Sequence, residues 1–234
     1  MTSHALSDAA LYRLLTWMSP SYPVGAYTYS HGLEAAVDAD GVETADAAEA
    51  WIADVVAHGG GFADAVFLLE AHAAAEAGDA ERLAAANELA LAFAPSQELL
   101  METASQGAAF LAVTLVVGDP PPLLAALGEQ EARGERVAYP VVVGCGAAEA
   151  GVAADAACLA YLHAFAANLV SACLRLAPVG QVAGQTMLAR LEPVVAEAAA
   201  RAGRTPPDAL GLSTIAVDIA SMRHETQYTR IFRS

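Results

Sequence analysis

Basic side chains are scarce in this chain. It contains no lysine, and its 11 arginines stand beside 27 acidic residues, which gives a net charge of −16. Residues 1–132 hold 19 of the acids and two of the arginines, whereas residues 133–234 hold eight acids and nine arginines. Binding to nucleic acid depends on many cationic contacts to phosphate groups. The composition therefore predicts no nucleic-acid partner and favours a protein partner.

Cysteine is also scarce, with only Cys145, Cys158 and Cys173. An odd number of cysteines in apolar surroundings is typical of reduced thiols, so we predict a cytoplasmic protein without a disulfide framework. The first ten residues have neither a basic end nor an apolar core, so we expect no signal peptide. The longest apolar runs, 108–117 and 159–170, fall short of the roughly 18 to 20 residues that span a bilayer or carry polar side chains. We therefore predict no membrane partner.

The alternation typical of β-strands is missing as well. Runs 111–117 and 136–144 are apolar enough for strands, but no hairpin pattern accompanies them. Apolar residues instead recur every three or four positions, which favours helices. We expect helices at about 7–18, 29–38, 44–58, 62–77, 79–94, 96–117, 120–131, 139–151, 154–177, 180–202 and 212–223. The predicted fold is all-α: a single domain, residues 1–234, forming an irregular antiparallel bundle of about ten helices.

Turn and capping residues separate the expected helices. Residues 59–61, all glycine, and Pro95 predict two of the breaks. Thr44 and Ser96 are expected helix N-caps. Three segments are predicted to be less regular: a Pro/Gly loop at 19–27, a linker at 203–211 and a C-terminal tail at 224–234.

Residues 28–32, Thr-Tyr-Ser-His-Gly, are similar to the G-x-S-x-G motif that holds the nucleophile in serine hydrolases. Thr28 stands where that motif has its first glycine, and a Pro/Gly loop precedes it instead of a buried strand. Ser30 and His31 are adjacent, so on a helix their side chains would point about 100° apart and would not meet as nucleophile and base. The pattern disfavours a hydrolase.

Patterns for metal or cofactor binding are weak. The histidines, which are His4, His31, His58, His72, His163 and His224, include no H-x-x-x-H pair, and the cysteines form no C-x-x-C pair. His224 and Glu225 could bind a divalent ion weakly, although a solvated pair is the more frequent role of such neighbours. The glycines of residues 144–151 lack dinucleotide-binding spacing, and close helix packing explains them better. We predict no catalytic constellation.

Two segments differ from this helical background. Residues 19–34 read SPSYPVGAYTYSHGLE, and residues 221–234 read SMRHETQYTRIFRS. Chain ends are usually frayed and rich in small polar residues. Arginine and aromatic residues are instead enriched where proteins bind one another. We expect the tail to dock, either on a partner or on its own bundle.

These two segments carry a resemblance to the urease accessory protein UreF family. PVGAYTYSHGLE at 23–34 resembles the family's front motif, and 221–234 resembles its C-terminal signature. Between them, three segments are similar to the family in the same order: PSQELLMETASQGAAFL at 95–111, YPVVVGCGAAEAGV at 139–152 and NLVSACLRLAPVGQVAGQTML at 168–188. The resemblance runs from about residue 9 to residue 234.

The resemblance implies an all-α accessory protein without catalysis of its own. Proteins of this family form dimers and bind UreD, also called UreH. The pair then recruits the GTPase UreG to apo-urease, where nickel enters the metallocentre. The resemblance thus implies that the complex handles nickel and that this chain holds no tightly bound cofactor. Within the family, the positions that match Tyr27 and Arg230 are linked to assembly of the GTPase complex.

From the motifs we predict a set of partner-binding residues at both ends of the chain: Tyr27, Tyr29, Ser30, His31, Glu34, Arg223, His224, Glu225, Tyr228, Arg230, Phe232 and Arg233. Pro20, Pro23 and Gly25 are expected to form a stiff turn that presents Tyr27 beside the tail. The resulting surface is expected to be weakly held without a partner. Its Arg230 is expected to stack on an aromatic ring or to pair with an acid.

Two other functions stay open at this point. One is a metallochaperone that binds nickel directly through His224 and nearby groups. The other is a hydrolase that uses Ser30 and His31, which the spacing disfavours.

Overall fold

The computed structural model describes residues 6–39, 41–117, 120–177 and 179–234. These residues form eleven α-helices, two short 3₁₀ helices and no strand. The α-helices are α1 (Asp8–Trp17), α2 (Leu33–Ala39), α3 (Ala45–His58), α4 (Gly60–Glu76), α5 (Ala80–Ala92), α6 (Gln97–Thr114), α7 (Pro122–Ala132), α8 (Tyr139–Glu149), α9 (Ala154–Leu176), α10 (Gln181–Ala202) and α11 (Ile215–His224). The 3₁₀ helices are η1 (Ala26–Thr28) and η2 (Pro207–Ala209). The all-α prediction is confirmed.

Ten of the eleven expected helices begin and end within three residues of the observed bounds. Thr44 and Ser96 are N-caps as predicted, since their side chains accept hydrogen bonds from the amides of Ala47 and Leu99. The prediction for 29–38 is wrong at its start, because α2 begins only at Leu33.

The late start of α2 has a local cause. His31 and Gly32 adopt positive φ angles of 57° and 78°, which no right-handed helix contains. Histidine tolerates this conformation better than most side chains, and the Gly32 position also lies against the backbone of Ser221, where a Cβ would come within 2.9 Å. The turn at residues 29–32 is therefore part of the packing against α11.

The glycines at 59–61 also act differently from the prediction. Only Gly59 interrupts the helices, because α3 ends at His58 and α4 begins at Gly60. A Cβ on Gly60 would overlap the ring of His31. Close packing likewise explains Gly144, since a Cβ there would overlap the carbonyl oxygen of Leu68. These glycines let neighbouring elements approach closely.

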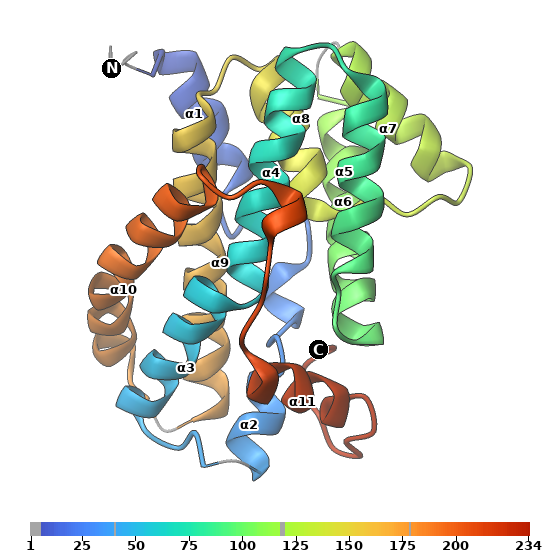
Figure 1. Ribbon diagram of the computed structural model, residues 1–234. Coiled ribbons are helices and arrows are strands. Elements are labelled where there is room, and N and C mark those ends of the chain that lie inside the picture. The colour runs from blue at the N-terminus through green and yellow to red at the C-terminus, as the bar shows by residue number, and fades with distance from the viewer. Residues whose placement is uncertain (1–5, 40, 118–119, 178) are drawn as a thin grey trace.

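Helix α4 runs through the middle of the bundle and packs against α8, α5, α3 and α9 (Figure 1). The buried apolar side chains of these helices join in one core cluster that also includes α1, α2, α6, α7, α10 and α11. Residues 203–214 then run back along the bundle, and α11 packs against α2 and α6. This route brings the tail to the front loop.

Two stretches are long and apolar enough on average to cross a membrane, although neither is an unbroken apolar run. They are 45–76, which comprises α3 and α4, and α9. Their apolar windows are 61% and 50% buried within the fold. Apolar core helices of globular proteins meet the same criteria, because they too are hydrophobic around most of their surface.

The three cysteines are free and buried, as the composition predicts. Burial raises the pKa of each thiol above its ordinary value. Because the thiolate is the reactive form, these side chains are inert packing residues.

Candidate functional site

The tail lies against the front loop. The amide of Arg233 donates to the carbonyl oxygen of Thr28 at 2.8 Å, and the amide of Ser30 donates to the main-chain oxygen of Ser234 at 2.9 Å. The Ser30 hydroxyl donates to the same oxygen, which lies 204 residues further along the chain. Figure 1 accordingly places the C-terminal end beside α11 and one end of α6. The two unusual segments of the sequence thus meet in space.

Glu34, on α2, anchors the tail. One of its carboxylate oxygens accepts from the amide of Ile231 at 2.7 Å, and the other accepts from the amide of Phe232 at 2.9 Å. The second oxygen also lies 3.0 Å from Nε2 of His224. Hydrogen bonds to an ionised carboxylate are roughly twice as strong as neutral ones. A single buried acid therefore binds both the tail and the end of α11.

His224 joins two carboxylates. Its ring is fully buried, with Nε2 toward Glu34 and Nδ1 2.6 Å from an oxygen of Glu98 on α6. The second oxygen of Glu98 accepts from the Arg230 guanidinium. A neutral imidazole carries one N–H group, whereas the protonated ring carries two and can donate to both acids. We call these four side chains, Glu34, His224, Glu98 and Arg230, the tail network.

Phe232 is a further anchor of the tail. It is buried, and the Arg175 guanidinium of α9 lies 4.2 Å from the centre of its ring. Partial burial lowers the pKa of Arg175, while nearby Tyr27 acts in the opposite direction. The ring stacking that the sequence suggested for Arg230 is therefore made by Arg175, whereas Arg230 pairs with an acid.

The twelve predicted residues divide into two groups. Tyr29, Ser30, His31, Glu34, His224 and Phe232 are buried, whereas Tyr27, Arg223, Glu225, Tyr228, Arg230 and Arg233 are exposed. The buried group ties the tail to α2 and α6, while the expectation of a weakly held surface stays a prediction. We use the name composite surface for exposed residues from both ends: Tyr27, Tyr228, Arg230 and Arg233.

Sequence reasoning missed the residues that hold this arrangement from α6. Glu98 receives His224 and Arg230, and Glu102 accepts from the Ser234 hydroxyl at 2.6 Å. Their i, i+4 spacing places both acids on one helix face, which is a usable but unspecific signal. Glu225 was predicted, but its observed contact was not: its carboxylate accepts from the amide of Gln97 at the start of α6.

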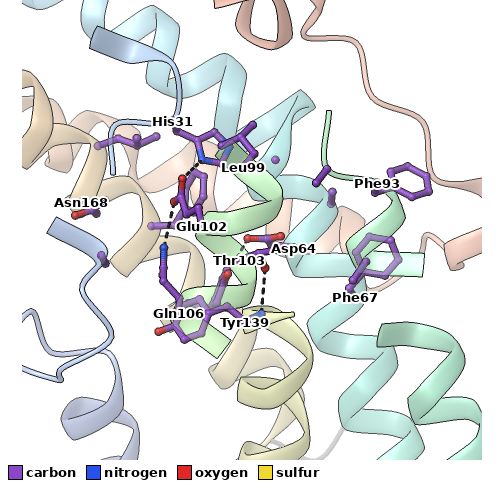
Figure 2. Close-up of a pocket in the computed structure, with 18 of the residues that line it drawn as sticks. His31, Asp64, Phe67, Phe93, Leu99, Glu102, Thr103, Gln106, Tyr139 and Asn168 are labelled. Carbon is purple, nitrogen blue, oxygen red and sulfur yellow. Dashed lines mark hydrogen bonds and ion pairs between the residues drawn. The ribbon is translucent and has the colours of Figure 1, made fainter. Parts of the chain in front are cut away.

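A cavity of about 110 Å³ lies between α4, α6, α8, α9 and α11. Two residues of its wall, His31 and Glu102, also contact Ser234 of the tail. Nδ1 of His31 faces Glu102 at 3.6 Å and is buried without a hydrogen-bond partner, a contact that Figure 2 marks with a dashed line. Gln106 donates to the other oxygen of Glu102 at 3.1 Å. On the opposite wall, the Tyr161 hydroxyl donates to Asp64 at 2.7 Å. We call His31, Asp64 and Glu102 the cavity cluster.

Burial and neighbouring charges together determine protonation in this cluster. Desolvation raises the pKa of Asp64 to about 7, although the Tyr161 hydrogen bond and His31 oppose it. Burial acts to lower the pKa of His31, but the nearby carboxyl groups of Glu102, Asp64 and Asp218 outweigh it, and the pKa is raised. The carboxyl group of Asp64 therefore titrates near neutral pH, in the same small cavity as a histidine whose pKa is raised.

The hydrolase alternative is not favoured by this geometry. The Ser30 hydroxyl is fully buried and donates to Ser234, while His31 faces Glu102. A nucleophile must instead lie within hydrogen-bond reach of its base.

Direct metal binding gains no support either. Within the part of the chain that the structure describes, no group of three or more His, Cys, Asp or Glu side chains is arranged to hold a metal ion. The ring nitrogens of His224 both face carboxylates. His4 lies outside the described residues.

Comparison with known proteins places these features in a family. A family model described as UreF matches residues 42–192. The urease accessory protein UreF of Bradyrhizobium sp. strain BTAi1 is 46% identical over 229 residues, which cover 98% of this chain and 94% of that protein. UreF of Methylobacterium sp. strain 4-46 is 51% identical over 221 residues, with coverages of 94% and 87%. UreF of Methylorubrum populi is 50% identical over 223 residues, with coverages of 95% and 98%. This chain belongs to the UreF family of urease accessory proteins.

Proposed function

We propose that this chain is a non-catalytic scaffold for urease maturation. Together with UreD (UreH), it recruits the GTPase UreG to apo-urease and supports nickel insertion into the metallocentre. It works in the cytoplasm as a homodimer, as one domain over residues 1–234, without a nucleic-acid or membrane partner. Nickel passes through the assembled complex and is not a tightly bound cofactor of this chain.

The observation that carries the proposal is the composite surface. Tyr228 is fully exposed and Tyr27 is 67% exposed, although both are large aromatic side chains. Arg230 and Arg233 lie on the same tail, and the buried Glu34 and His224 hold its backbone in place. Tyrosine and arginine dominate binding hot spots, and an anchored backbone loses less entropy on binding than a mobile one.

The wider surface supports association with other chains. Leu11, Tyr12 and Leu15 are exposed on α1, and Ile219 and Met222 are exposed on α11. Apolar side chains that gather on an exposed helix face are typical of interfaces between proteins. The net charge of −16 favours partners that present basic surfaces.

Urease activation tests the proposal. We would measure urease activity and bound nickel in cells that express apo-urease, UreD and UreG with and without this chain. Activity and bound nickel are expected only when the chain is present. Full activity in its absence would overturn the proposal.

Point variants then test the composite surface. Tyr27→Ala and Arg230→Ala are expected to reduce activation and the capture of UreG in a pull-down. Val182→Ala and Arg133→Ala are matched controls, because these side chains are also exposed but lie on α10 and after α7. Equal capture of UreG by all four variants would exclude the composite surface as the binding site.

A further inference from the structure

The cavity cluster and the tail end, which we define as residues 231–234, share a side chain. One oxygen of Glu102 accepts from the Ser234 hydroxyl at 2.6 Å and faces Nδ1 of His31 at 3.6 Å. The amide of His31 itself lies 3.4 Å from the Ser234 hydroxyl oxygen. The same two residues thus line the cavity and receive the tail.

We propose that docking of the tail end is coupled to the protonation state of the cavity cluster, so that the tail is held firmly in mildly acidic solution and loosens as the pH rises. The coupling passes through Glu102, which can be neutralised by His31 and also accepts the hydrogen bond of Ser234. The inference depends on the proposed function only for its biological use, and the isolated chain suffices to test it.

The direction of the effect follows from the charges. At mildly acidic pH, the raised pKa values keep His31 cationic beside Glu102 and keep Asp64 neutral. As the pH rises past about 7, Asp64 ionises, and once His31 loses its proton the cation that faces Glu102 is gone. Two carboxylates then share a buried cavity without a cation, which is costly in a low-dielectric environment. Release of the tail end admits water to Glu102 and relieves this cost.

The other elements around the cavity supply no compensating cation. Tyr161 on α9 and Tyr139 on α8 face the cluster, and burial raises the pKa of both phenols, so they stay neutral. Asp218 on α11 adds a further carboxylate, and burial raises its pKa as well. His31 also contacts the edge of the Phe165 ring on α9. Among the described residues that line the cavity, His31 is therefore the only group that can become cationic.

The cavity itself can carry the coupling between its two walls. Liquid water occupies about 30 Å³ per molecule, so 110 Å³ has room for a few molecules. The unpartnered Nδ1 of His31, the carboxylates of Asp64 and Glu102 and the amide of Gln106 offer such molecules hydrogen-bond partners. Through hydrogen bonds of such water molecules, the protonation state of Asp64 affects Glu102 on the other wall.

Hydrogen exchange of the tail amides tests the proposal in the isolated chain. The amides of Ile231, Phe232 and Arg233 all donate hydrogen bonds in the docked tail. We expect their protection factors, corrected for the pH dependence of intrinsic exchange, to fall between pH 6 and pH 8. The expected fall is about 5- to 150-fold, the usual range for coupling between two sites. Equal protection at both pH values would overturn the proposal.

A variant separates the contribution of this cluster from that of the tail network. Asp64→Asn keeps the shape of the neutral acid but cannot ionise, so its tail protection is expected to depend much less on pH. Asp54→Asn removes one exposed carboxylate from α3 and is expected to behave like the unmodified chain. A pH dependence that persists in full in Asp64→Asn would show that Asp64 does not control docking of the tail and would overturn the proposal.

An NMR titration covers the case in which Asp64→Asn does not fold. In the unmodified chain, the side-chain carboxyl signal of Asp64 and the amide signal of Ser234 are expected to titrate with one shared midpoint. Distinct midpoints, or a Ser234 signal that does not titrate, would contradict the coupling. None of these experiments involves UreD, UreG or urease, so their failure is distinguishable from a failure of the proposed function.

Discussion

Charged side chains occur in two very different settings in this molecule. Arg190 lies near Asp46 and Glu49 on the outside of α3 and α10, at 3.8 Å and 3.4 Å, with its side chain 59% exposed. The tail network and the cavity cluster place comparable charges in the interior, where His224 is fully buried. Water screens the first setting and is excluded from the second. The contrast teaches that position, more than the number of charges, decides which acids matter here.

The largest expected effect concerns the pH dependence of stability. Asp64 has a pKa of about 7 in the fold and 3.8 as a free side chain, so between these values the folded chain binds a proton that the unfolded chain does not. This contribution to stability is complete below about pH 4 and is lost as the pH rises to 7, and the raised pKa of His31 adds a loss above 6.5. The loss from Asp64 is on the order of 4 kcal/mol.

Urea unfolding at several pH values measures this effect. The difference in unfolding free energy between Asp64→Asn and the unmodified chain is expected to grow in favour of the variant from pH 4 to pH 8. Asp54→Asn, on the exposed face of α3, serves as the control and is expected to show little change. A constant difference across this range would mean that Asp64 is not held neutral by burial.

The second prediction breaks the tail network at its centre. Glu34→Gln keeps the size of the side chain but removes the charge that His224 and the amides of Ile231 and Phe232 share. Loss of one partner from a buried ionic group costs about 3 kcal/mol or more. We expect lower thermal stability and fast hydrogen exchange across the tail. Unchanged protection of residues 231–233 would show that other contacts hold the tail.

A smaller effect is expected at the stacked pair. Arg175→Ala removes the guanidinium over the Phe232 ring and is expected to cost about 1 kcal/mol. Arg175→Lys retains a cation but loses the planar stack, so it should restore only part of the loss. Chemical unfolding of both variants checks the order. If the lysine variant matched the unmodified chain, charge alone would explain the contact.

The smallest effect is predicted for the exposed charges. Arg190→Ala is expected to change the unfolding free energy by about 0.5 kcal/mol or less, because Arg190 pairs with Asp46 and Glu49 in contact with water. The small difference should vanish in about 1 M salt, where charges are screened within roughly 3 Å. A loss as large as that of Glu34→Gln would abolish the distinction between the two settings.

The sequence predicts the helices well because their apolar periodicity is local. The start of α2 is the exception, since the turn at His31 and Gly32 depends on α11 and on the tail nearly 200 residues later. The same limit applies to the site. The motifs identify Tyr27, Arg230 and Glu34, but nothing local shows that Glu34 lies inside and Tyr27 outside.

Glu98 and Glu102 show this limit most clearly. Both stand in a segment that resembles the family, yet α6 has many possible faces for an acid to occupy. His224 and Arg230, which bind Glu98, and Ser234, which binds Glu102, all come from the far end of the chain. Sequence patterns of 3.6 residues carry no information about such distant pairs.

The hydrogen bonds between Ser30 and Ser234 also determine when the composite surface can exist. Contacts of such long sequence separation close a very large loop, and they form late because the intervening chain must first be ordered. The front loop and the tail must therefore both be in place before this surface exists. The surface is consequently a property of the folded chain, which neither segment possesses by itself.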